Sequence, residues 1–271
     1  ALLMLWCLAS ATAMAGEAEN DWRYRFSGGT AVEHFTNDYG TWGGLDLSLY
    51  LRGSKSTTYF VNTSLWERND GLGAIGSIGA WLDIAEPLYT YTALSMGSES
   101  VHNPLFRFDH EFNFKLGQAR RFVATAGVTI VRYHDDHYDL MPFPGLTVYL
   151  DNWVLGYRLQ INISNPGEVI SLSHRGWVEF GREGHHVTTL TGLFGKAAYL
   201  DVDPAGRSEV SNQSFYAALR HTNWIGDSWG LYGEVNFLTL SDQYQKVGGI
   251  LGAFIEWGQV TSAMRRQSWQ R

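Results

Sequence analysis

The segment Tyr133-His134-Asp135-Asp136-His137 carries the side chains most capable of chemistry in this 271-residue chain. A histidine beside a carboxylate can act as an oriented general base, and paired aspartates can share a proton or a water molecule. The same side chains are suitable ligands for a divalent metal. Four consecutive polar residues cannot all converge on one point, so we favour a solvated turn for this His/Asp cluster (His134, Asp135, Asp136 and His137) over metal binding or catalysis.

Other reactive side chains have weaker patterns. Ser173 and His174 are adjacent in a predicted strand, where successive side chains point to opposite faces, so this serine cannot take its base from this histidine. We expect His174 on an interfacial or subunit-facing surface. His185-His186 lies beside a short turn, and Asp201-Val202-Asp203 lacks the glycine and distant glutamate of a recognised calcium site. We therefore assign no catalytic residue, metal or cofactor.

The elements that position these side chains are read best from 106–116, FRFDHEFNFKL. Aromatic or aliphatic residues alternate with polar ones, which is the period of a β-strand with one apolar and one ionic face. Similar segments of about ten residues recur along the chain. We predict strands at 22–27, 42–51, 56–66, 72–82, 87–95, 106–116, 121–132, 138–150, 152–162, 168–181, 185–198, 212–223, 228–238 and 247–257.

The connections between these segments alternate between short and long. The long ones are predicted at 33–41, 67–71, 96–105, 133–137, 163–167, 199–211 and 239–246. Outer-membrane barrels have short periplasmic turns and longer external loops. We therefore predict an all-β, transmembrane, antiparallel up-and-down β-barrel with both termini in the periplasm. The strand number should be even, fourteen in this assignment and twelve if two weak neighbours are one.

Composition and the first residues agree with export. Thirty Gly, 14 Tyr, 14 Phe and 11 Trp against 6 Pro are typical of many short strands, and the net charge of −7 argues against a nucleic-acid partner. Residues 1–15 form an apolar stretch ending in a small-x-small signature. We expect a secretion signal over 1–15, clipped at its start, which contains Cys7, then a barrel domain over 16–257 and a short polar tail over 258–271.

A soluble β-sandwich is the alternative to the barrel, since tryptophan and tyrosine are also good strand residues. We favour the barrel because the two-residue period, the loop asymmetry and the signal agree. Tryptophans near segment ends are expected in interfacial girdles. These are Trp22, Trp42, Trp66, Trp153, Trp224, Trp229 and Trp257.

Charged side chains on the lipid face of a barrel are costly, so the charges within strands should face the lumen. The candidates are Arg23, Arg25, Asp46, Arg107, Asp109, Glu111, Lys115, Arg158, Arg175, Glu179, Arg220 and Glu234. Opposite charges could pair and plug the interior, or line a polar channel for small anions or sugars. Both signs occur in similar numbers, which favours pairing and a plugged or very narrow lumen, because an ion-selective pore more often carries one sign.

Three motifs resemble the central hairpins of the YaiO-type outer-membrane proteins. They are Arg107-Phe108-Asp109, then 132–136 (RYHDD), and Gly156-Tyr157-Arg158, within a resemblance that spans most of 22–257. The resemblance implies an outer-membrane barrel of unassigned biochemical role, with relatives in which a similar barrel is attached to exopolysaccharide export machinery. Family barrels end on an aromatic residue, whereas Trp257 is followed by a tail here.

The expected function is a porin-like structural or transport role in the Gram-negative envelope, linked to exopolysaccharide export. A surface hydrolase that uses the His/Asp cluster is the alternative. The expected partners are outer-membrane lipid, lipopolysaccharide, the barrel assembly machinery and polysaccharide. Arg132 shares its parity with the lipid-facing Val128 and Ile130, so we expect it to contact lipopolysaccharide phosphate, with simple snorkelling as the alternative.

Overall fold

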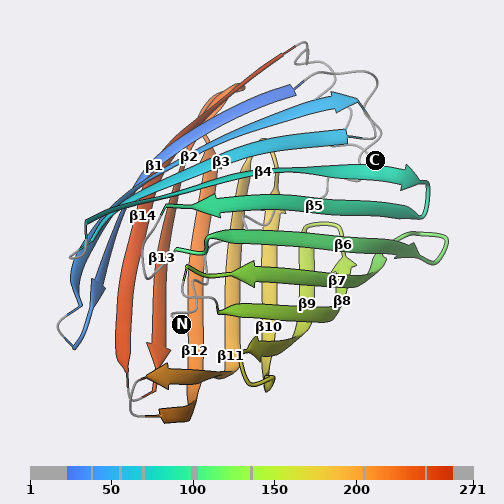
Figure 1. The fold of residues 1–271 in the computed structure, drawn as a ribbon. Coiled ribbons are helices and arrows are strands. Elements are labelled where there is room, and N and C mark those ends of the chain that lie inside the picture. The colour runs from blue at the N-terminus through green and yellow to red at the C-terminus, as the bar shows by residue number, and fades with distance from the viewer. Residues whose placement is uncertain are drawn as a thin grey trace.

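The strands form one antiparallel sheet that closes on itself (Figure 1). The computed structural model describes residues 23–37, 39–54, 57–68, 71–98, 103–134, 137–203, 206–241 and 243–258. In these residues it contains fourteen strands: β1 (Arg23–Phe35), β2 (Gly40–Ser54), β3 (Thr57–Arg68), β4 (Gly71–Ala85), β5 (Leu88–Gly97), β6 (Phe106–Leu116), β7 (Phe122–Arg132), β8 (Tyr138–Tyr149), β9 (Trp153–Asn165), β10 (Val169–Arg182), β11 (His186–Asp203), β12 (Gly206–Trp224), β13 (Trp229–Leu240) and β14 (Tyr244–Gly258).

Each strand pairs with its neighbours in sequence, and β1 closes the barrel by pairing with β14 from Arg23↔Gly258 to Phe35↔Lys246. The predicted antiparallel up-and-down barrel and its favoured count of fourteen strands are confirmed. Closure pairs every strand on both sides, so the described sheet has no open edge. Among the described residues, no helix is both long and apolar enough to cross a membrane.

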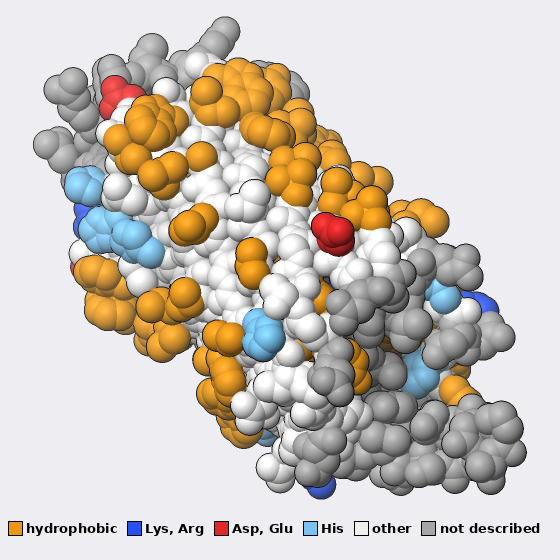
Figure 2. Space-filling model, turned by 90° about the vertical axis from the view of Figure 1, so that its left-hand side faces the viewer, with side chains coloured by type: hydrophobic (Ala, Val, Ile, Leu, Met, Phe, Trp, Pro, Cys, Tyr) orange, Lys and Arg blue, Asp and Glu red, His pale blue; other side chains and the backbone are white. Residues whose placement is uncertain are grey.

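The alternation in β6 divides its side chains between two environments. Asp109, Glu111 and Asn113 are 5%, 6% and 3% exposed, whereas Phe112 and Phe114 are each 44% exposed. A protein in water would bury the phenylalanines and expose the carboxylates. The inverted arrangement is the one a barrel adopts in lipid, with apolar side chains outside and polar ones inside. Figure 2 shows the result on one outer face, where hydrophobic side chains greatly outnumber charged ones.

The two ends of the barrel differ less than the sequence indicated. We call the end with Arg23 and Gly258 the terminal end and the other the distal end. Strands join after 54, 85, 116, 149, 182 and 224 at the terminal end, and after 35, 68, 97, 132, 165, 203 and 240 at the distal end. Only 98–105 is a clearly long distal connection. The connection predicted at 133–137 has those bounds, and the one predicted at 96–105 is close to the observed 98–105. The other five are shorter than predicted, because the strands continue beyond their apolar parts.

The largest error concerns the loop predicted at 199–211, which lies in the hairpin of β11 and β12. Their pairing continues to Asp203↔Gly206, although β10 leaves β11 at Gly195 and β13 leaves β12 at Ser214. β11 and β12 have 18 and 19 residues, whereas about 9–11 suffice to cross the bilayer. The hairpin therefore projects beyond the barrel wall. A strand surrounded by water needs no apolar face, so this segment lacks the alternation that identified the others.

The tryptophan girdle is present in part. Trp153, Trp229 and Trp257 are 45–47% exposed on the outer face near the terminal end. Trp42 and Trp66, however, are 6% and 2% exposed and point inward. Trp224 also points inward, and Trp22 lies outside the described residues. Assignment of Trp42, Trp66 and Trp224 to the girdle was wrong, because position along a strand does not decide which face a side chain takes.

Candidate functional site in the barrel lumen

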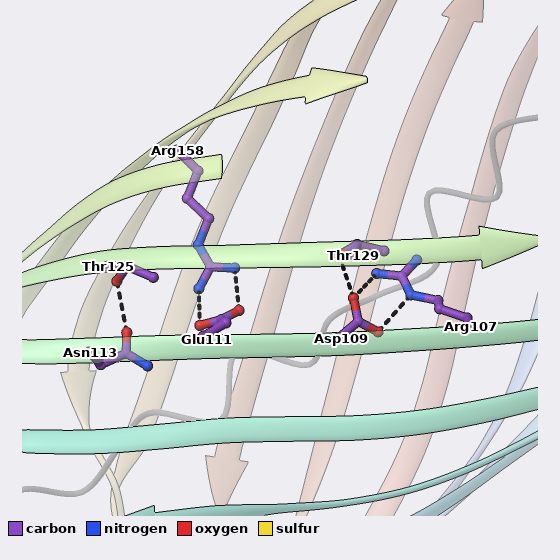
Figure 3. A network of polar contacts seen from close by, with 7 residues as sticks. All are labelled: Arg107, Asp109, Glu111, Asn113, Thr125, Thr129 and Arg158. Atoms are coloured by element: carbon purple, nitrogen blue, oxygen red, sulfur yellow. Dashed lines mark hydrogen bonds and ion pairs between the residues drawn. The ribbon is translucent and has the colours of Figure 1, made fainter. Parts of the chain in front are cut away.

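Two of the predicted lumen residues form a fixed pair on the inner face of β6. The Arg107 Nε and one terminal nitrogen donate to the two carboxylate oxygens of Asp109, at 2.7 and 2.8 Å. The Thr129 hydroxyl, on the neighbouring β7, donates to Asp109 at 2.6 Å (Figure 3). A bidentate pair with a third donor holds the carboxylate in one orientation and neutralises its charge. Asp109 therefore acts as a structural hydrogen-bond acceptor.

A second pair joins strands that are not neighbours. Arg158 on β9 donates to both Glu111 oxygens on β6, at 2.7 and 3.0 Å, and its side chain leans over the inner faces of β8 and β7 (Figure 3). The guanidinium carbon lies 5.0 Å from the centre of the Phe143 ring and 5.5 Å from that of the Trp177 ring. The pair combines an ionic bond with two aromatic faces, and each face adds a cation–π contact.

Glycines make room for this arrangement. A Cβ at Gly145, directly opposite Arg158, would lie 3.1 Å from the arginine Cγ, and one at Gly127 would lie 2.4 Å from the Phe143 ring. Other inward aromatic rings also lie over a glycine of the adjacent strand, which holds them flat against the wall. These cross-strand pairs are Gly44 with Trp66, Gly79 with Phe60, Gly156 with Trp177, Gly230 with Phe254 and Gly252 with Tyr232.

Arg25 organises the terminal mouth of the lumen. Its Nε donates to Glu256 at 2.8 Å, and its side chain also forms an ion pair with Glu183 in the turn between β10 and β11. The guanidinium carbon lies 5.3 Å from the centres of the Trp224 and Phe254 rings. Arg25 thus connects β1, β14 and a turn from another part of the wall, which narrows this opening.

The structure also places the remaining described candidates on the inner face. Arg220 lies 3.6 Å from Glu234, and the Ser64 hydroxyl donates to Asp46. Lys115 lies 3.5 Å from Asp83. Arg175 is 5.9 Å from the centre of the Trp177 ring, and Glu179 accepts a hydrogen bond from Thr189. The side chain of Arg23 lies outside the described part of the chain.

Several ionic residues of the lumen were not among the candidates. Glu33 pairs with Lys246 at 2.6 Å near the distal end, and Glu256 and Glu183 pair with Arg25. Glu256 could have been found from its parity in the last strand. Glu33 and Lys246 fall in segments that the sequence predicts as loops, and Glu183 lies in a turn, so the two-residue period gives no information on them.

Outside the strands, exposed ion pairs lie at the terminal end, and Arg120 with Glu86 is one of them. Arg120 donates a hydrogen bond to Glu86 in the connection between β4 and β5. This bond and the arginine charge hold the pKa of the Glu86 carboxyl below its usual value. The pair joins two neighbouring turns at the surface, where such contacts add little stability.

The two described residues of the His/Asp cluster, His134 and His137, have different surroundings. His134 is exposed, and Asp135 and Asp136 lie outside the described residues. His137 is only 6% exposed, so its assignment to a solvated turn was wrong. It points into the distal mouth, where its ring meets Tyr133 edge to face at 5.5 Å. His137 is two residues before the inward-facing Asp139, and side chains two residues apart in an extended chain point to the same face. This spacing explains why His137 is buried.

A serine and a carboxylate do approach His137. Its Nε2 is 2.7 Å from the Ser164 hydroxyl and 3.4 Å from Asp139 Oδ1. In a nucleophilic relay the two partners occupy different ring nitrogens, whereas here both meet Nε2. Ser164 is also 1% exposed. This geometry gives no support to a hydrolase, and among the described residues no three His, Cys, Asp or Glu side chains form a metal-binding group.

On the outer face, Arg132 is exposed at the distal end of β7, on the same side as Ile130. Ser173 and His174 lie on opposite faces of β10. The serine donates to the inward Gln160 at 3.4 Å, and His174 Nδ1 is 2.8 Å from the outward Tyr157 hydroxyl. His174 also stacks on Phe194 at 4.7 Å. His186 likewise faces outward, with its ring 6.2 Å from that of His221.

The closed antiparallel barrel, with its apolar outer and ionic inner face, defines an outer-membrane β-barrel protein of bacteria. The chain belongs to the YaiO membrane beta barrel family, whose model matches residues 24–200. Its fold is similar to that of the Acinetobacter baumannii outer membrane protein Omp33, with a TM-score of 0.51, 13% identity and coverage of 89% of this chain and 100% of that one. It is also similar to the CymD monoaromatic hydrocarbon channel, with a TM-score of 0.55, 7% identity and 89% coverage of each chain. Sequence identities this low show only that the folds are similar. No curated protein matches the sequence.

Proposed function

We propose that this barrel is a slow transporter of small neutral polar solutes, saccharides in particular, with a role linked to exopolysaccharide export. The observation that carries the proposal is the Arg158–Glu111 pair beside Phe143 and Trp177. The two charges neutralise each other, yet their nitrogen and oxygen atoms remain polar. A sugar ring needs this combination, because its hydroxyls form hydrogen bonds while its apolar face packs on an aromatic ring.

The other ion pairs support a preference for uncharged solutes. Several cations that extend from the wall have an acidic neighbour, as in Arg107 with Asp109 and Lys246 with Glu33. A lumen that alternates paired charges offers little net attraction to either anions or cations. Arg25 and its partners narrow the terminal mouth, so passage should be slow.

Planar bilayers and liposome swelling test this proposal together. We expect small conductance steps with weak ion selectivity, and swelling in an isotonic disaccharide such as maltose. Glu111→Gln leaves the Arg158 charge without its carboxylate, so it should shift selectivity toward anions. Glu67→Gln, at an exposed position on the outer face, is the control and should change nothing. A flat current trace together with no swelling would contradict the proposal.

The link to exopolysaccharide export is supported only by the family resemblance. It is tested in cells, where deletion of the gene should lower secreted polysaccharide and the intact chain should restore it. Equal secretion in both strains would contradict this part of the proposal and leave the transport assay unaffected.

We further propose that the distal end faces the outside, with both chain termini and Trp257 toward the periplasm and the assembly machinery. The β11–β12 hairpin, which projects from the distal end, supports this orientation, because outer-membrane barrels carry their longer extensions outside. In a Cys7→Ser background, a membrane-impermeant maleimide should label His134→Cys on intact cells. Asp227→Cys, in the opposite turn, should react only after the outer membrane is permeabilised. The reverse pattern would contradict the orientation.

A further inference from the structure

The hydrogen-bond ladder between β8 and β9 is interrupted near the middle of the wall. Pairing runs from Tyr138↔Asn165 to Leu140↔Ile163 and resumes at Gly145↔Arg158. The register is the same on both sides of the interruption, so no residue is bulged out. The other side of β8 pairs with β7 without a gap from Phe122↔Val148 to Arg132↔Tyr138. The interruption therefore belongs to this one seam.

Two prolines explain the interruption. In β8, the N–H of Tyr149 donates to Arg121, on the β7 side, and that of Leu150 donates to Trp153, on the β9 side. Even-numbered residues of this strand therefore direct their backbone groups toward β9. Pro142 and Pro144 have even numbers and lack an N–H. Each of the four missing pairs requires one of these two donors, so the prolines account for all of them.

The consequence lies on β9, where the carbonyls of Leu159 and Ile161 lose their ladder donors. Pro142 and Pro144 are the fifth and seventh of the twelve residues of β8, so this happens at mid-depth in the bilayer. Backbone acceptors without donors are costly in hydrocarbon, and prolines are rare in strands paired on both sides for the same reason. The seam is thus a site where a donor from another molecule would be stabilised.

Polar groups flank the seam on both faces. On the outer face, Leu159 pairs with His174, which is bonded to the exposed Tyr157 hydroxyl at 2.8 Å. These are polar side chains on a surface that otherwise contacts lipid. On the inner face, Asn162 has a buried Oδ1 that accepts no hydrogen bond, and Gln160 lies two residues away. Polar side chains therefore lie on both the outer and the inner face of the wall at this point.

We propose that the β8–β9 seam is a lateral portal through which an amphiphile passes between the lumen and the bilayer. The ladder is intact on both sides of the gap, so the opening is local and the barrel stays closed elsewhere. The ligand is a single-chain amphiphile whose head group carries hydrogen-bond donors, such as hydroxyls. The donors satisfy the acceptors of Leu159, Ile161 and Asn162, while the chain remains in lipid beside the two prolines.

This proposal does not depend on transport along the barrel axis. It is tested by the rate at which a lumen-facing thiol, Gln160→Cys in a Cys7→Ser background, is labelled in proteoliposomes. N-dodecylmaleimide partitions into the bilayer and should reach this thiol through the seam. A small sulfonated methanethiosulfonate enters only from water and reports on access along the lumen.

Pro142→Val combined with Pro144→Val restores both donors and should close the seam. We expect it to slow labelling by N-dodecylmaleimide roughly ten-fold or more, since two ladder hydrogen bonds must then break for passage. Labelling by the water-soluble reagent should not change. The matched control, Leu140→Val with Leu146→Val, alters two outward side chains of the same strand that already have donors, and it should leave both rates unchanged.

Equal N-dodecylmaleimide rates with and without the prolines would overturn the proposal, as would failure of this reagent to reach the thiol in the parent barrel. An equal loss of both rates would also overturn it, because that result indicates a changed lumen. If the double variant does not fold, Pro144→Val alone restores the donor to Leu159 and should give a smaller slowing in the same direction.

Discussion

Replacing Glu111 with Gln should lower the free energy of unfolding of the barrel by about 3 kcal/mol. The side chains of Glu111 and Arg158 are 7% and 17% exposed, and their two bonds of 2.7 and 3.0 Å have bidentate geometry. Removing one partner of a buried pair costs about 3–5 kcal/mol, because the remaining charge is left uncompensated. We expect the low end of this range, since the glutamine oxygen can still accept one hydrogen bond.

The matched control is Asp83→Asn, which breaks a looser pair with Lys115 in the same barrel. The closest atoms are 3.5 Å apart, and the Asp83 side chain is 43% exposed. Exposed pairs contribute about 0–1 kcal/mol, so this variant should be nearly as stable as the parent.

Urea unfolding in lipid vesicles, followed by tryptophan fluorescence and by the mobility of the folded barrel on gels, measures both values. Combining Glu111→Gln with Arg158→Met should cost about 2 kcal/mol less than the sum of the single changes, because the stranded charge is gone. Equal losses for Glu111→Gln and Asp83→Asn, or strict additivity in the double variant, would refute the idea that this pair is buried and coupled.

Three other substitutions test separate parts of the barrel. Gly156→Val should destabilise the barrel by about 1–3 kcal/mol, because a Cβ at this position would lie 1.9 Å from the Trp177 ring. The control Gly192→Val should be tolerated, because a Cβ there has nothing within 4 Å. Equal unfolding midpoints for the two variants would contradict this prediction. Arg25→Ala should raise single-channel conductance roughly two-fold by widening the terminal mouth, and an unchanged step size would show that the constriction lies elsewhere. Arg132→Ala should reduce the lipopolysaccharide that copurifies with the barrel, and unchanged retention would favour snorkelling.

The alternation of single strands was sufficient to predict the barrel and the side of the wall on which most charges lie. In β6, Arg107, Asp109 and Glu111 follow directly from the two-residue period. The same period places Trp42 inside, since it shares its parity with Asp46, whereas its position near a strand end predicts an interface. The two-residue alternation therefore predicts which face of the wall a tryptophan occupies better than its position near a strand end does.

Partners across the lumen could not be predicted from the sequence. Arg158 and Glu111 are 47 residues apart, and their contact depends on the register of three successive hairpins. The burial of His137 likewise follows from the phase of β8. The prolines in β8 were visible from the start, but which neighbour loses its hydrogen bonds depends on whether their backbone groups face β7 or β9.

The central claim is that the odd-numbered residues of β6 form part of an ionic lumen while its even-numbered residues contact lipid. Spin labels placed one at a time from Asp109 to Leu116 in a Cys7→Ser background test it by their collision rates with oxygen, which concentrates in the bilayer. We predict a two-residue alternation, with high rates at Phe112, Phe114 and Leu116 and low rates at Asp109, Glu111 and Asn113. A flat profile, or an alternation of the opposite phase, would contradict the account.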